Sequence, residues 1–298
     1  MSASLLVAIP FALFAIVLLF CFVGCHVVFP LDDVRPGFTR YTEIILAEPT
    51  LVAYWPLGEA AGETTAVELK AGRNGAYLSQ VLPDDPSFPS AAAPGTLILG
   101  QPGIVEGDRV PPHDASSART TCIEVNGGYV SVPFDPALNP TKAEGFTIEA
   151  WVRTEWSASD TAAQRDIMAS VDAAGGVVKG YALLSSEANI WQAIVFTGGG
   201  ATFATGPEVI LDATSHLVLT YDGSLLRLFV NGTQSTAVAT DYQPSTESRL
   251  FIGAGGPELP EPRAPWVGKI QCVALYKGAL PPERVAKHAL YGNGVDAT

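Results

Sequence analysis

The sequence has 298 residues, of which 17 are Lys or Arg and 30 are Asp or Glu, so its formal net charge is −13. A nucleic acid partner is excluded, because phosphate binding needs a cluster of basic residues that this composition does not supply. Intrinsic disorder is excluded as well, since 48% of the residues are hydrophobic, which is enough for a packed core.

The chain begins with a long apolar segment. Leu5–Phe29 contains no Asp, Glu, Lys or Arg, and about 20 apolar residues suffice for a helix that crosses a bilayer. We therefore expect a transmembrane anchor over residues 1–29, which inserts through residues 5–29. Two alternatives stay open: a cleaved signal peptide, and lipidation of Cys25, because the four residues that end there resemble a bacterial lipobox.

Residues 30–50 are expected to form a short juxtamembrane stalk, since four Pro or Gly residues interrupt them. From Leu51 onward, short β-rich runs recur between clusters of Gly, Pro, Asn and Asp, which is typical of an antiparallel sandwich or jelly roll. The expected strands are Leu51–Leu57, Ala76–Val81, Thr121–Val125, Tyr129–Val132, Phe146–Thr154, Ala182–Ser185, Ile190–Phe196, His216–Tyr221, Leu225–Val230, Arg249–Ile252 and Val267–Tyr276.

Three further segments have their own patterns. Asn231-Gly232 after the run Leu225–Val230 predicts a type I′ hairpin turn, because both residues accept positive φ. A second helix is expected over Pro281–Tyr291, with proline at its start and glycine just beyond its end. Residues 82–120 are rich in Pro and Ala, which predicts an irregular insertion, and residues 293–298 form a tail.

Several of these runs resemble the laminin-G-like, concanavalin A-like jelly-roll family of bacterial surface proteins and phage tail proteins. Phe146-Thr-Ile-Glu-Ala-Trp-Val152 is similar to the central strand of that family, and the hairpin from His216 to Thr233 is similar to the next pair of strands. The resemblance implies a mainly β fold over residues 51–292, with two antiparallel sheets, behind the N-terminal transmembrane helix and with a short C-terminal helix. It is specific for the fold and not for the ligand.

The resemblance also raises the question of calcium. Family members often carry an Asp in the first Gly-Asn-rich loop and an Ile-Asp-Glu sequence in the last strand, where Glu68 and Gln271-Cys272 stand here. Calcium takes six to eight oxygen ligands, so the missing carboxylates argue against a site. Glu68, Asp212 and Asp222 are interpreted as solvated turn residues, and we expect no cofactor and no metal site.

An enzyme of this fold would need a pair of carboxylates. Glucanases of this fold carry a Glu-x-Asp-x-x-Glu pattern, which is absent here, and Glu149 and Glu155 are its nearest approximation. No nucleophile motif occurs, and no motif partner is found for any of the four His residues, which are His26, His113, His216 and His288. We therefore expect a protein that is not an enzyme; the alternative, a glycosidase, would depend on Glu149.

Two cysteines lie in the expected β domain. The resemblance implies that the strands around Cys122 and Cys272 are neighbours in one sheet, so a disulfide between them is plausible. It would close a loop of about 150 residues and contribute up to roughly 4–5 kcal/mol. Two buried free thiols are the equally weighted alternative.

Trp156, Trp191 and Trp266 are the candidate ligand-binding residues, because they lie near expected strand ends or loops, where an exposed ring can stack on a sugar or fill a partner's pocket. The alternative is that each ring covers a sheet edge or the core. The expected function is a membrane-anchored binding module on the periplasmic or extracellular side, which recognises a glycan or a protein surface. A structural accessory subunit of a larger membrane or virion assembly is the alternative.

Overall fold

The computed structural model describes residues 40–79, 95–108, 120–157, 163–256 and 263–295. The expected transmembrane anchor, Cys25 and the first part of the expected stalk lie outside these ranges. Among the residues within them, no helix is long and apolar enough to cross a membrane.

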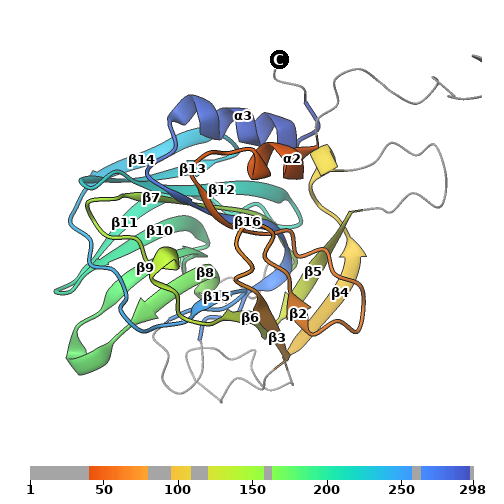
Figure 1. Ribbon diagram of the computed structural model, residues 1–298, viewed down its shortest axis with the longest axis horizontal. Helices are drawn as coiled ribbons and strands as arrows, with labels where there is room; N and C mark the ends of the chain where they lie inside the picture. The colour runs from red at the N-terminus through yellow and green to blue at the C-terminus, as the bar shows by residue number, and fades with distance from the viewer. Residues whose placement is uncertain (1–39, 80–94, 109–119, 158–162, 257–262, 296–298) are drawn as a thin grey trace, which may run out of the picture. The chain divides into compact units, whose positions relative to one another are not determined.

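The described residues form two eight-stranded antiparallel sheets that pack on one another, as the sequence predicts (Figure 1). Sheet A contains β14 (Thr233–Ala239), β13 (Leu225–Val230), β12 (Thr214–Tyr221), β7 (Phe146–Thr154), β16 (Val267–Lys277), β5 (Thr121–Asn126) and β4 (Thr96–Pro102) in that order, with β1 (Leu51–Trp55) also paired to β16. Sheet B contains β11 (Ala201–Glu208), β10 (Ile190–Thr197), β9 (Lys179–Ser185), β8 (Arg165–Asp172), β15 (Leu250–Ile252), β6 (Gly128–Val132), β3 (Gly75–Ser79) and β2 (Thr65–Ala66) in that order. Short 3-10 turns occur at η2 (Glu106–Asp108), η3 (Pro136–Leu138) and η4 (Ala174–Gly176).

The main core lies between the two sheets and follows from the alternation of side chains along each strand. On β7, Phe146, Ile148, Ala150 and Val152 all point into this core. The residues between them on β7 point to the other face of sheet A. Glu149 is one of these, and it is nevertheless fully buried.

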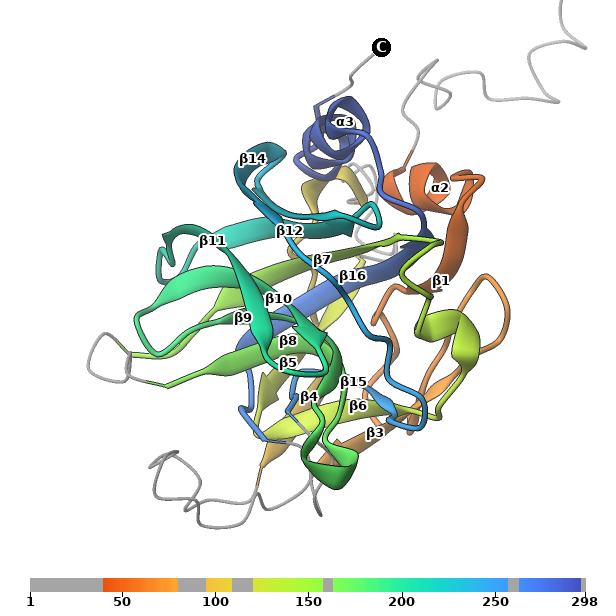
Figure 2. The ribbon, with the colours of Figure 1, turned by 90° about the vertical axis from the view of Figure 1, so that its left-hand side faces the viewer.

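Two helices account for that burial. α2 (Tyr41–Leu46) and α3 (Pro282–Gly292) lie side by side against the outer face of sheet A, and neither lies on sheet B (Figure 2). α3 confirms the expected C-terminal helix. α2 falls within the expected stalk, yet Tyr41 and Ile45 are fully buried in a second hydrophobic cluster beneath the helices.

Some strands lie where the sequence predicts none. β4 lies inside the segment 82–120, and its alternating exposure is that of an edge strand. The prolines and glycines of that segment had indicated irregular structure. β8, β11 and β14 are also additional strands, and β11 contains Gly206 and Pro207, two residues that are depleted in strands.

Of the two alternatives for the cysteine pair, the structure has the free thiols, because Cys122 and Cys272 are buried and form no disulfide. Their strands are neighbours, since Ile123 on β5 pairs with Ile270 on β16. The ladder between β16 and β7 is interrupted after Gln271, however, and Cys272 has φ 55° there. Its Sγ accepts a hydrogen bond from the Tyr54 hydroxyl at 3.1 Å, whereas the Cys122 thiol donates to the Pro102 carbonyl.

Candidate functional site

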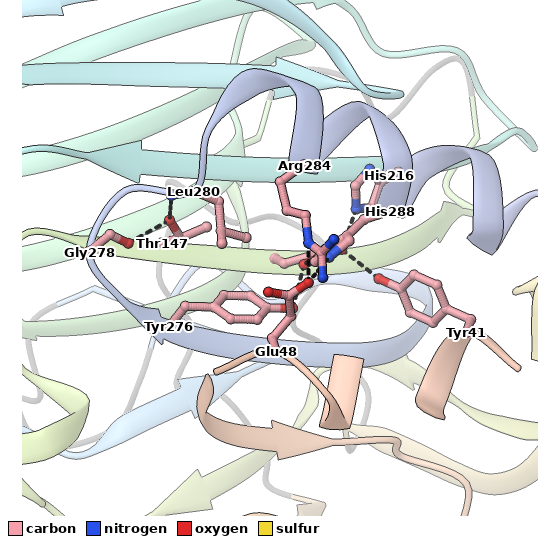
Figure 3. Close-up of polar contacts among 10 residues, drawn as sticks. Tyr41, Glu48, Thr147, His216, Tyr276, Gly278, Leu280, Arg284 and His288 are labelled. Carbon is pink, nitrogen blue, oxygen red and sulfur yellow. Dashed lines mark hydrogen bonds and ion pairs between the residues drawn. The ribbon is translucent and has the colours of Figure 1, made fainter. Parts of the chain in front are cut away.

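Glu149 is the centre of a polar network that is buried between sheet A and the two helices, and Figure 3 labels the residues around it. His216 on the neighbouring strand β12 and Tyr276 on β16 contact it from within the sheet. Tyr41 of α2 and His288 of α3 contact it from above. Residues from five elements therefore meet at one carboxylate.

Four side chains bind the two oxygens of Glu149. The Tyr41 hydroxyl donates to Oε1 at 2.5 Å, and the Tyr276 hydroxyl donates to Oε2 at 2.6 Å. His216 Nε2 lies 2.7 Å from Oε1, and His288 Nδ1 lies 3.0 Å from Oε2. Both oxygens are thus saturated by protein groups, so the carboxylate is not available to a substrate in this conformation.

A second carboxylate extends the network to the segment that follows α2. His288 Nε2 lies 2.9 Å from Glu48 Oε1, so its imidazole bridges two carboxylates, and Arg284 forms an ion pair with the same oxygen of Glu48. Thr147 holds the start of α3 from β7, because its hydroxyl accepts from the backbone of Leu280 and donates to the carbonyl of Gly278. Figure 3 shows these contacts together.

The charged groups of the network raise the pKa of His288 and lower the pKa of Glu149. Burial by itself would lower the pKa of His288, but the charge of Glu149 and hydrogen bonds to both carboxylates raise it to about 9. Burial would raise the pKa of Glu149, yet His288 and His216 hold it well below its usual range. At neutral pH the network therefore contains an imidazolium between two carboxylates, which fastens α2 and α3 to sheet A.

Of the residues that the sequence singles out, Glu149, His216 and His288 lie in this network, and the three candidate tryptophans lie apart from it. Glu149 is the nearest match to a catalytic carboxylate in the sequence, and the structure places it beneath both helices. His216 and His288 have no motif partner in the sequence, yet both bind Glu149 across 67 and 139 residues of chain. No local spacing could indicate these contacts, since they depend on the pairing of β7 with β12 and on the docking of α3.

Trp156, Trp191 and Trp266 are brought together, but inside the core. Trp156, the most exposed of them, retains only 4% of its surface. Its ring meets Trp266 edge to face at a centroid distance of 5.2 Å, and Trp191 stacks on Trp266 at 6.1 Å. The Arg165 guanidinium lies over the Trp156 ring at 4.4 Å. The three rings belong to the main core and present no free face to a ligand in this structure.

The loop before β3 does not fit a calcium site. Glu68 is buried rather than solvated, and its two oxygens accept hydrogen bonds from four backbone N–H groups, those of Tyr54, Lys70, Ala71 and Arg73, at 2.6–3.1 Å. Donors that converge on the carboxylate would repel a cation. Across the described ranges, no group of three His, Cys, Asp or Glu side chains is placed to hold a metal ion.

Sheet B presents the other candidate surface, because its outer face is free of both helices (Figure 2). Phe203 on β11 is 47% exposed there. It pairs with Ile194 on β10, and Phe196 on the same face of β10 is half-buried. Gln192 and Thr205 form the neighbouring pair, and both are half-buried. Two aromatic rings thus lie beside an amide and a hydroxyl on one face of the β10–β11 hairpin.

Comparisons with known proteins agree with this fold. The sequence profile of the concanavalin A-like lectin/glucanases superfamily matches residues 125–286. No curated protein matches the chain in sequence.

Solved structures with a similar fold include the sialidase of Trypanosoma rangeli in complex with sialic acid, at 15% identity and a TM-score of 0.51, over 84% of this chain and 34% of the sialidase. The carbohydrate-binding module CBM40 of the Ruminococcus gnavus IT-sialidase, bound to α2,3-sialyllactose, is similar at 16% identity and a TM-score of 0.42, over 49% of this chain and 83% of the module. At these identities the similarities indicate the fold alone. The chain spans about a third of the length of the sialidase.

One expectation from the sequence is corrected by these comparisons. The absence of a catalytic carboxylate pattern predicts that the chain is not an enzyme, and that expectation is contradicted, because a sialidase, which is a glycosidase, shares the fold over 84% of this chain. The absence of a motif is weak evidence against catalysis when the same fold occurs in both enzymes and binding modules.

Proposed function

Because the chain belongs to the concanavalin A-like lectin/glucanases superfamily, we propose that its jelly roll binds glycans through the outer face of sheet B. One observation carries this proposal: the exposed ring of Phe203 lies beside Phe196, Gln192 and Thr205 on a sheet face that neither helix covers. Aromatic rings stack on the apolar face of a sugar, and amide and hydroxyl groups hydrogen-bond its hydroxyls.

The outer face of sheet A is less suited to a glycan than the outer face of sheet B. Sheet A is covered there by α2 and α3, and the carboxylate and both imidazoles beneath them are bound to one another. Those groups hold the fold together, whereas Gln192 and Thr205 lie at a half-exposed surface. A ligand on sheet B therefore needs no rearrangement of the helices.

We further propose that residues 5–29 hold this glycan-binding domain at a membrane, with the jelly roll on the periplasmic or extracellular side. The support is the length of Leu5–Phe29 and its lack of charged residues, which suit a helix that spans a bilayer. Extraction tests it: the full-length protein is expected to stay with membranes in high salt and carbonate and to dissolve only in detergent. Release by carbonate would contradict the anchor.

Replacing Phe203 with Ala is expected to weaken glycan retention by about tenfold or more, because a central aromatic contact is worth upward of about 1.4 kcal/mol. The measurement is retention of the detergent-solubilised full-length protein on a panel of immobilised oligosaccharides, with hydrolysis of the same glycans followed in parallel. Leu290→Ala is the matched control, since Leu290 is 44% exposed on α3, on the other sheet's outer face.

The control separates a local effect from a general loss of surface hydrophobicity. Equal retention by Phe203→Ala and Leu290→Ala would place the glycan elsewhere on the molecule. Failure of the unmodified protein to retain any glycan of the panel would reject glycan binding itself.

A further inference from the structure

We infer that the glycan recognised by the β10–β11 face is neutral rather than acidic. This inference rests on the proposed function and adds the chemical class of the ligand. It comes from the side chains around Phe203: those on the outer face of the hairpin are uncharged, and the exposed charges at one end of the hairpin, Glu187 and Glu208, are negative.

Strand register identifies the side chains on that face. Directly opposed residues in an antiparallel pair point to the same side of the sheet. The pairs that share the outer face of the hairpin with Phe203 are Gln192 with Thr205, Ile194 with Phe203, and Phe196 with Ala201. Trp191, Ala193 and Val195 alternate with them on β10 and face the core. All six outward residues are uncharged.

Two exposed acidic residues lie at one end of this uncharged surface. Glu208 ends β11 opposite Ile190, and Glu187 lies in the turn between β9 and β10; both are exposed. Asp166 on β8 lies in the same cross-strand row as Gln192, through Leu184 on β9, but burial raises its pKa to about 7, so at neutral pH it carries only part of a negative charge. A sialic or uronic acid carboxylate on the hairpin would therefore find no cation on this face, in a protein whose net charge is already −13.

Basic residues of sheet B do not offset these charges at the hairpin. Arg249 reaches the outer face through a hydrogen bond of 3.4 Å to the Ser131 hydroxyl on β6. β6 is four strands from β10, about 19 Å at the usual strand spacing, which exceeds the screening length of about 8 Å at physiological salt. Lys179 lies two residues before Tyr181 on β9, so its side chain points to the same side of the sheet as that of Tyr181, which faces the core.

The groups that remain suit a neutral sugar. Phe203 and Phe196 are diagonal neighbours across the hairpin, which is within contact range for aromatic rings. They can cover the C–H face of a hexose, while the Gln192 amide donates and accepts hydrogen bonds and the Thr205 hydroxyl does the same. These partners match sugar hydroxyls, and a carboxylate would need a cation that the hairpin does not contain.

The test compares paired glycans that differ only in an acidic terminal residue: neutral gluco-, galacto- and manno-oligosaccharides, and their sialylated or uronic forms. The full-length protein is expected to retain at least one neutral member at least tenfold more strongly than its acidic counterpart, and this retention is expected to change little between 50 and 500 mM salt, a range over which attraction between charges is progressively screened. Phe203→Ala should abolish the preference.

Gln192→Lys supplies the converse measurement, because it adds a cation at the half-exposed position beside Phe203. It is expected to raise retention of the acidic member at least tenfold relative to the unmodified protein. Stronger or equal retention of acidic glycans by the unmodified protein, lost in Phe203→Ala, would overturn the neutral class while leaving glycan binding intact. Retention of no glycan at all would reject the proposed function instead.

Discussion

Replacing Glu149 with Gln is expected to lower the free energy of unfolding by about 3–5 kcal/mol, the usual cost of removing one partner from a buried ion pair. The amide has nearly the shape of the carboxylate, so the change tests charge and hydrogen bonding rather than packing. An amide oxygen can accept from only some of the four donors, and its NH₂ group would face donors. His288 would keep its contact with Glu48 but lose its anion on β7.

Chemical denaturation with urea measures this change as a shift of the midpoint. Glu155→Gln is the matched control, because Glu155 follows the same strand β7 but is partly exposed, with ion-pair distances of 3.9 Å to Arg153 and 3.6 Å to Lys269. Such exposed pairs contribute about 1 kcal/mol or less. A loss in Glu149→Gln no larger than that in Glu155→Gln would contradict the assigned role of the network.

The second large effect is a loss of stability at alkaline pH that depends on His288. Its pKa is about 9 in the folded protein, against about 6.5 in an unfolded chain. A raised pKa means that the folded state binds the proton more tightly. The contribution of His288 is therefore complete below about pH 6.5 and is lost as the pH rises through 9, by an amount on the order of 3 kcal/mol.

The measurement is the free energy of unfolding at intervals from pH 6 to pH 10, for the unmodified protein and for His288→Gln. Glu149 and Glu48 face the imidazole from β7 and from the end of α2, and Arg284 binds Glu48 from α3. The difference between the two proteins is expected to be largest at pH 6, to shrink as the pH rises from about 6.5, and to be nearly gone above pH 9. Parallel curves over the whole range would mean that His288 carries no extra proton in the folded state.

Strand alternation made much of the fold predictable from the sequence. Along Phe146–Thr154, every second residue is apolar, and the structure places those side chains in the core. Asn231 and Gly232 have φ values of 51° and 79°, which confirms the expected turn with two positive φ values between β13 and β14. In these cases the local pattern and the tertiary environment agree, which is the condition for prediction from sequence.

The candidate sites depend on contacts that the sequence does not encode locally. The alternation of β7 places Glu149 on the face away from the main core, but the burial of that face depends on α2 and α3. Trp156 and Trp266 lie near strand ends, and only packing decides that they meet in the core. Phe203 belongs to β11, a strand that the sequence pattern does not predict, because Gly206 and Pro207 are residue types depleted in strands.

The central claim is that a glycan binds the outer face of sheet B, and a crystal structure of the protein with a retained oligosaccharide tests it most directly. The account predicts a sugar ring stacked on Phe203, with its hydroxyls hydrogen-bonded to Gln192 and Thr205. A sugar bound at any other surface, with the β10–β11 hairpin bare, would contradict it.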